Sequence, residues 1–161
     1  MALDASQWTD ANLQPPIDKH VIANFLYITY HEAAHLVYAP FFAAWCASSS
    51  TSCNNFASCI EGLTDAEGNS KNYDKDSNNP CAEAYANDST SQNLCINKMQ
   101  VCQNGDLTQE QKDAMIAELD AGIAAANSRC AEQSADCVNC GGPPMPSGFN
   151  NCNPTSCDCP E

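Results

Sequence analysis

The chain has 161 residues, with six Lys and Arg against 20 Asp and Glu, and its formal net charge is −14. Nucleic acids and anionic membranes are bound through basic surfaces, so this charge argues against both as partners and favours solubility. The length is that of one domain, and we treat residues 1–161 as a single domain.

Residues 1–17 are expected to form an N-terminal arm, which Pro15 and Pro16 end. The first five residues have neither the positive start nor the apolar run of a signal peptide. We therefore expect one of two histories. Either a leader is removed before the numbered chain begins, or the protein is made in a reducing cytoplasm and released by lysis, as a virus or phage particle is.

The first principal helix is predicted over about 18–39, where Asp18 can open it and Pro40 stops it. At 100° per residue, seven apolar side chains share one broad face: Val21, Ile22, Phe25, Leu26, Ile28, Leu36 and Val37. A membrane span is not expected, because hydrocarbon would bury four polar or charged side chains: Asn24, His31, Glu32 and His35. The pattern therefore indicates a soluble, buried helix.

The pentapeptide from His31 to His35, His-Glu-Ala-Ala-His, lies within this helix. Histidines four residues apart on a helix can present two imidazoles to one zinc ion, and Glu32 would then be the general base that accepts a proton from water. The alternative is a pair of histidines at the edge of the helix that are satisfied by local hydrogen bonds.

Further along, residues 61–65 read Glu-Gly-Leu-Thr-Asp. Together with the His-Glu-Ala-Ala-His segment, they resemble the zinc site of the thermolysin-like gluzincin metallopeptidases. That resemblance implies zinc as cofactor, Glu61 as the third ligand and Asp65 as the residue that orients a ligand histidine.

The segment 46–80 is rich in Ser, Asn and Asp and is predicted to be loop. Asp74, Asp76 and Asn78 follow the alternating oxygen spacing of calcium loops, but Asn79 stands where such loops have glycine. The alternative is a solvated acidic turn. Asn87 begins an Asn-Asp-Ser glycosylation sequon.

Two short helices are predicted over 80–86 and 92–103, and a second principal helix over about 109–130. Thr108 can cap that helix, with Gln111 bonding back to it. Apolar residues recur along it at helical spacing, so we expect it to pack on the first helix. Residues 18–135 then form a helical body, and residues 136–161 form an irregular tail rich in Cys, Pro and Gly.

The twelve cysteines are the feature that best defines the class of protein: Cys46, Cys53, Cys59, Cys81, Cys95, Cys102, Cys130, Cys137, Cys140, Cys152, Cys157 and Cys159. The number is even and the apolar core is thin, so we expect six disulfides that stabilise a small, mainly α domain in an oxidising environment. Sequence leaves their connectivity open. The alternative is that the last five cysteines bind zinc or an iron–sulfur centre.

These observations favour a non-enzymatic structural subunit of an extracellular assembly or a virus or phage particle. Its partners would be copies of itself or other subunits, and no cofactor is expected. Two alternatives remain: a zinc metallopeptidase of gluzincin type, and a secreted binding or adhesion module assisted by calcium.

Overall fold

The computed structural model describes residues 19–76, 78–153 and 157–159. The predicted arm, residues 1–17, lies outside the described residues, as do the side chains of Val21, Ile22 and Asn24.

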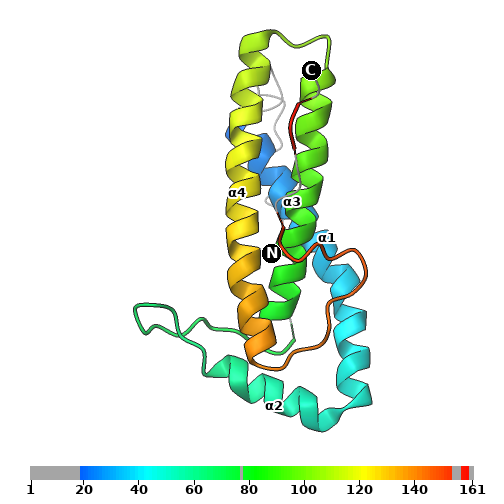
Figure 1. Cartoon of the computed structure of the whole chain (residues 1–161), viewed down its shortest axis with the longest axis vertical. Helices are drawn as coiled ribbons and strands as arrows, with labels where there is room; N and C mark the ends of the chain where they lie inside the picture. Colours follow the sequence, from blue (N-terminus) through cyan, green and yellow to red (C-terminus); the bar gives the residue numbers. More distant parts are fainter. Residues whose placement is uncertain (1–18, 77, 154–156, 160–161) are drawn as a thin grey trace, which may run out of the picture.

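The described chain is mainly helical and has four helices: α1 (Lys19–Ser48), α2 (Ser50–Glu61), α3 (Pro80–Gln103) and α4 (Gln109–Asn139). Its one β-type pairing is an isolated bridge between Thr64 and Ser70. Helices α3 and α4 form a long antiparallel pair, α1 crosses behind them, and α2 runs across the lower end (Figure 1). The prediction of a small, mainly α, disulfide-rich protein is therefore confirmed.

Helix α1 does not end at Pro40, and the predicted stop there is wrong. Proline removes one helical hydrogen bond, but aromatic side chains follow it on the face that meets the core. The ring of Phe42 lies 6.1 Å from that of Tyr38 and 5.8 Å from that of Phe56. Burial of these rings offsets the lost bond, so the helix continues to Ser48.

Helix α2 occupies part of the segment predicted to be loop. The side chain of Ser49 caps it by accepting a hydrogen bond from the backbone of Ser52, and its buried residues Cys53, Phe56 and Ile60 recur at helical spacing.

Helix α3 is continuous where two short helices are predicted. Most of the polar residues between them are buried, because α3 packs against α1 and α4 and the tail covers Asp88. Thr90 donates to the carbonyl oxygen of Ala86 at 2.7 Å, which satisfies its hydroxyl inside the helix. Burial against other parts of the molecule therefore makes these residues helical, although the local sequence does not predict a helix there.

Helix α4 begins where predicted, with the capping box between Thr108 and Gln111, and it continues beyond residue 130 to Asn139. Residues 136–139, predicted as part of the tail, therefore belong to the last turn of α4.

The described cysteines form six disulfides, as the even count predicts, and none of them is free. The pairs are Cys46–Cys53, Cys59–Cys140, Cys81–Cys137, Cys95–Cys157, Cys102–Cys159 and Cys130–Cys152. They join α1 to α2, α2 to the end of α4, α3 to α4, and the tail to both long helices. All five cysteines considered as metal ligands are engaged in these bonds, and the disulfides fit an oxidising, extracellular type of environment.

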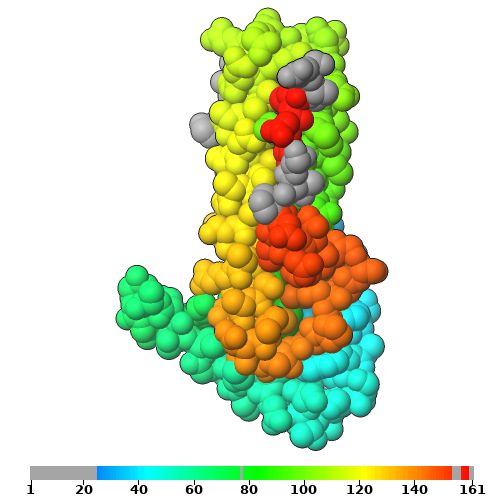
Figure 2. All heavy atoms as spheres, viewed as in Figure 1, coloured from blue at the N-terminus to red at the C-terminus, as the bar shows by residue number. Residues whose placement is uncertain are grey.

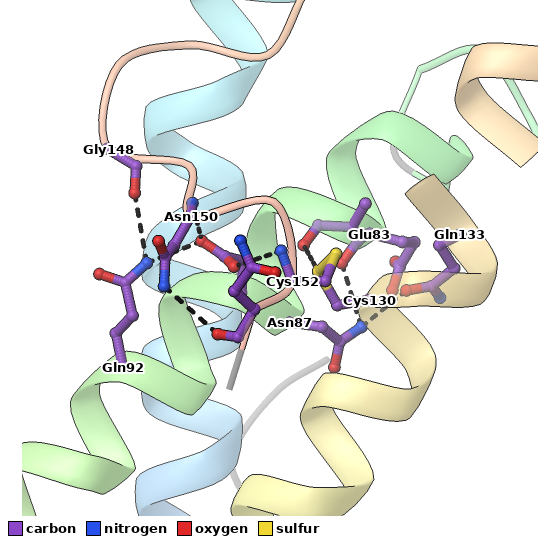
Figure 3. Close-up of a disulfide and its surroundings, with 11 residues drawn as sticks. Glu83, Asn87, Gln92, Cys130, Gln133, Gly148, Asn150 and Cys152 are labelled. Carbon is purple, nitrogen blue, oxygen red and sulfur yellow. Dashed lines mark hydrogen bonds between the residues drawn. A yellow bond between two sulfur atoms is a disulfide. The ribbon is translucent and has the colours of Figure 1, made fainter. Parts of the chain in front are cut away.

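The tail lies along the surface of the α3–α4 pair (Figure 2). Besides its disulfides, it is held by Asp88 of α3, whose side chain is 2% exposed. The carboxylate accepts the backbone N–H groups of Asn150 at 2.7 Å and Cys152 at 3.0 Å, beside the Cys130–Cys152 disulfide (Figure 3). A buried carboxylate is tolerated here because backbone donors satisfy it.

Candidate metal centre

The two histidines of α1 meet an acidic residue of α3. The Nε2 atoms of His31 and His35 are 3.2 Å apart. Each lies 3.3 Å from a carboxylate oxygen of Glu83, His31 from Oε2 and His35 from Oε1. We call these three residues the metal centre, because their ligand atoms all lie within 4.8 Å of one another.

Local structure explains how the three residues come together. One turn of α1 separates the histidines, so both rings project on the same side of the helix. Glu83 lies in the first turn of α3, which begins at Pro80 after Asn79. The side chain of Asn79 accepts the N–H of Ala82 at 2.9 Å, and this cap fixes the start of the helix beside α1.

The carboxylate of Glu83 is ionised. Burial alone would raise its pKa, but hydrogen bonds from His31 and His35, together with the positive charge that these rings carry when protonated, outweigh burial and lower the pKa to about 2. The centre therefore offers one anionic oxygen ligand beside two imidazole nitrogens.

A hydrogen-bond network behind the metal centre joins three helices. The ring of Tyr27 stacks on that of His31, with centroids 5.7 Å apart. The Tyr27 hydroxyl donates to Asn87 and accepts a hydrogen bond from Arg129 at 3.0 Å. Asn87 in turn donates to the carbonyl oxygen of Glu83 at 3.0 Å and to Gln133 at 2.8 Å (Figure 3). Residues of α1, α3 and α4 thus hold both sides of the centre in place.

The residues present fit a zinc ion. Two imidazoles and a carboxylate are the ligand set of many catalytic zinc sites, which keep a fourth position open. His31 Nδ1 is buried without a hydrogen-bond partner in the described structure, whereas its Nε2 faces His35 and Glu83. Both rings therefore direct Nε2 towards the place where a cation would be held, and these nitrogens, which donate to Glu83 in the described structure, would give up their protons to bind it.

A groove with a volume of about 560 Å³ opens beside the metal centre. Residues of α1 between Tyr27 and Ala39 line one side of it, and Asp76, Ala82 and Glu83 line the other. Glu32, which is exposed, lies in this lining with both histidines. The predicted general base and the metal centre therefore share one cavity.

The predicted ligand Glu61 is placed differently. It is the last residue of α2, it is exposed, and it belongs to none of the potential metal-binding groups among the described residues. Asp65 accepts the backbone N–H groups of Glu67 at 3.0 Å and Asn69 at 2.8 Å, so it stabilises its own turn. The hydrogen bonds from Asn69 lower the pKa of Asp65.

The predicted calcium residues form a turn of the same kind. Asp74 accepts the backbone N–H groups of Asp76 at 2.8 Å and Asn78 at 3.1 Å. This arrangement fits the solvated acidic turn that the sequence offers as the alternative. Asn87, the glycosylation candidate, is 1% exposed and its amide is engaged behind the metal centre, which leaves no room for a glycan.

Glu83 is the candidate ligand that sequence reasoning misses. Two signals accompany it: it lies in a first helical turn directly after an Asn-Pro cap, and a second polar residue, Asn87, follows at a spacing of four. Neither signal identifies a ligand until the packing of α3 on α1 is known.

No protein family, curated protein or solved structure matches this chain. Among the described residues, none of the helices combines the length and apolar character that crossing a membrane requires.

Proposed function

We propose that the protein is a zinc-dependent hydrolase of peptide bonds. Zinc would be held by His31, His35 and Glu83, and Glu32 would be the general base. One observation carries this proposal: three ligand atoms from two different helices converge within 4.8 Å, in the groove that Glu32 also lines.

Zinc would supply Lewis-acid polarisation of the substrate carbonyl group. Glu32 accepts a proton from the attacking water as the new C–O bond forms, and it passes that proton to the departing amine as the C–N bond breaks. The ligand residues keep fixed positions during this exchange, because the network through Tyr27 and Asn87 orients His31 and Glu83.

Four single substitutions test the proposal. His35→Ala and Glu83→Gln remove ligands and are expected to weaken zinc binding by a factor of about 100 or more. Glu32→Gln should retain zinc and lose about 10²- to 10⁴-fold in peptide hydrolysis. Glu61→Gln is the matched control, because the gluzincin resemblance makes it a ligand and the observed packing does not.

Metal analysis of each purified variant, together with cleavage of a casein digest, gives the result. If Glu61→Gln loses zinc and Glu83→Gln keeps it, the third ligand is Glu61, as the gluzincin resemblance implies, and not Glu83. Wild-type protein that binds no zinc at micromolar concentration would contradict the proposal altogether.

A second candidate is the non-enzymatic structural subunit of an extracellular assembly or of a virus or phage particle. The observation that favours it is the cross-linking of all four helices and the tail by disulfides, which suits a stiff subunit. Sedimentation of the native material distinguishes the two. A regular assembly with no zinc favours the subunit, whereas a zinc-containing monomer favours the hydrolase.

A further inference from the structure

We propose that the groove beside the metal centre selects peptide segments in which an apolar residue is flanked by Lys or Arg. This inference rests on the proposed function and names the substrate class of the same site.

The apolar part of this preference comes from α1. Leu36 is 80% exposed and Ile28 is 37% exposed, and both line the groove beside the histidines. Large side chains left open to water next to a candidate reaction centre provide contact area for an apolar side chain of a ligand. A volume of about 560 Å³ is sufficient for a short stretch of peptide rather than for a folded partner.

The charge preference comes from three carboxylates. Glu32, Asp76 and Glu83 line the groove, and the described lining contains no Lys or Arg. A bound Zn²⁺ ion and Glu83 would together carry one positive charge, and the two negative charges of Glu32 and Asp76 outweigh it, so the zinc-loaded groove keeps one net negative charge that attracts cationic side chains. The net charge of −14 adds a long-range attraction of the same sign, so acidic peptides and nucleic acids are repelled.

A buried donor adds a polar contact for the peptide backbone. Tyr38 lines the groove and is 1% exposed, and its hydroxyl has no hydrogen-bond partner in the described part of the chain. A buried hydroxyl without a partner is costly, and a peptide carbonyl oxygen would accept its proton.

Two fluorescein-labelled peptides of equal length test the charge preference, Gly-Lys-Leu-Lys-Gly and Gly-Glu-Leu-Glu-Gly. Their binding to zinc-loaded wild-type protein is measured by anisotropy at low and at high salt. We expect the Lys peptide to bind about tenfold more tightly at low salt, and the ratio to fall to about two- or threefold at high salt. Equal affinities at low salt would overturn the proposal.

Substitutions assign the effect to the groove. Asp76→Asn should reduce the discrimination about two- to threefold, whereas Asp106→Asn should leave it unchanged. Asp106 is exposed between α3 and α4, beyond some twenty residues of helix and therefore about 30 Å from Glu83. Equal effects of the two variants would overturn the assignment to the groove.

Two further variants test the contacts. Leu36→Ser should weaken both peptides about three- to tenfold through lost apolar contact, and Tyr38→Phe should weaken both about two- to fivefold. If both variants bind both peptides as the wild type does, the groove is not the binding site and the proposal is wrong.

The outcome for the groove is separable from that for the hydrolase. If Glu83→Gln keeps its zinc, the assignment of Glu83 as a ligand is wrong. If the wild type nevertheless binds the Lys peptide more tightly, the selectivity of the groove is still supported. If zinc is bound by the three ligands and hydrolysis proceeds equally on both peptides, only the selectivity fails.

Discussion

At the scale of single residues, the fold depends on a few positions where backbone and sulfur approach closely. Gly142, three residues beyond the end of α4, lies against the Cys81–Cys137 disulfide. A Cβ atom added there would be 2.4 Å from Cys81 Sγ, 2.7 Å from Cys137 Sγ and 2.9 Å from a ring carbon of Phe56. None of these neighbours is the end of a flexible side chain, so the structure requires glycine.

We expect Gly142→Ala to lower the free energy of unfolding by about 1–3 kcal/mol, because the disulfide or the ring must shift. Gly105→Ala is the matched control, since no atom beyond its two chain neighbours lies within 4 Å of its added Cβ. Urea denaturation of both variants measures the difference. A Gly142→Ala variant as stable as the control would show that this packing is looser than described.

At the scale of elements, the position of the loop between α2 and α3 depends on side-chain contacts between residues that lie far apart in the sequence. The loop between α2 and α3 is fixed to α4 by Lys71, which contacts Glu132 at 2.7 Å and Asp136 at 2.6 Å. Tyr73 donates to the same Asp136 at 3.2 Å. Burial and the neighbouring Asp136 carboxylate raise the pKa of Tyr73, so its hydroxyl remains protonated.

Replacing Lys71 with Met should release this loop from α4. Amide hydrogen exchange in residues 63–74 is expected to accelerate at least tenfold, while the middle of α4 exchanges at the wild-type rate. Lys75→Met removes the same charge at an exposed position and should change little. Unchanged exchange in the loop of the Lys71 variant would contradict this account.

The sequence correctly predicts helix boundaries where neighbouring residues, such as a cap, determine them. The cap at Thr108 and Gln111 and the apolar spacing after it give the start of α4 correctly. The continuation of α1 through Pro40 and the union of two short helices in α3 depend on burial against other helices, which periodicity does not register. The residues of the metal centre likewise differ in how far the sequence predicts them. The spacing of His31 and His35 is visible in the chain, whereas Glu83 becomes a partner only after α3 packs on α1.

At the scale of the whole molecule, disulfides take over much of the role of a hydrophobic interior. The buried core consists of two modest clusters, and cysteines belong to both: Cys81 and Cys137 to one, Cys95 and Cys157 to the other. Four of the six bonds close loops in which the cysteines are 56 or more positions apart. Each such bond contributes about 2–4 kcal/mol, chiefly by restricting the unfolded chain.

Reduction should therefore unfold the protein under conditions in which the oxidised form is stable. We expect the thermal transition to fall by more than about 20 °C, or to be lost, after treatment with a phosphine reductant. Circular dichroism follows the transition, and non-reducing peptide mapping checks the six pairs. A transition temperature that reduction leaves unchanged would show that the core suffices without cross-links.

The metal centre is most directly tested by X-ray absorption at the zinc edge of the zinc-loaded, oxidised protein. The described geometry predicts a first shell of nitrogen and oxygen only, at about 2.0–2.1 Å, with the outer-shell scattering of two imidazoles. A shell containing sulfur at about 2.3 Å, or one without imidazole, would contradict the assignment of His31, His35 and Glu83.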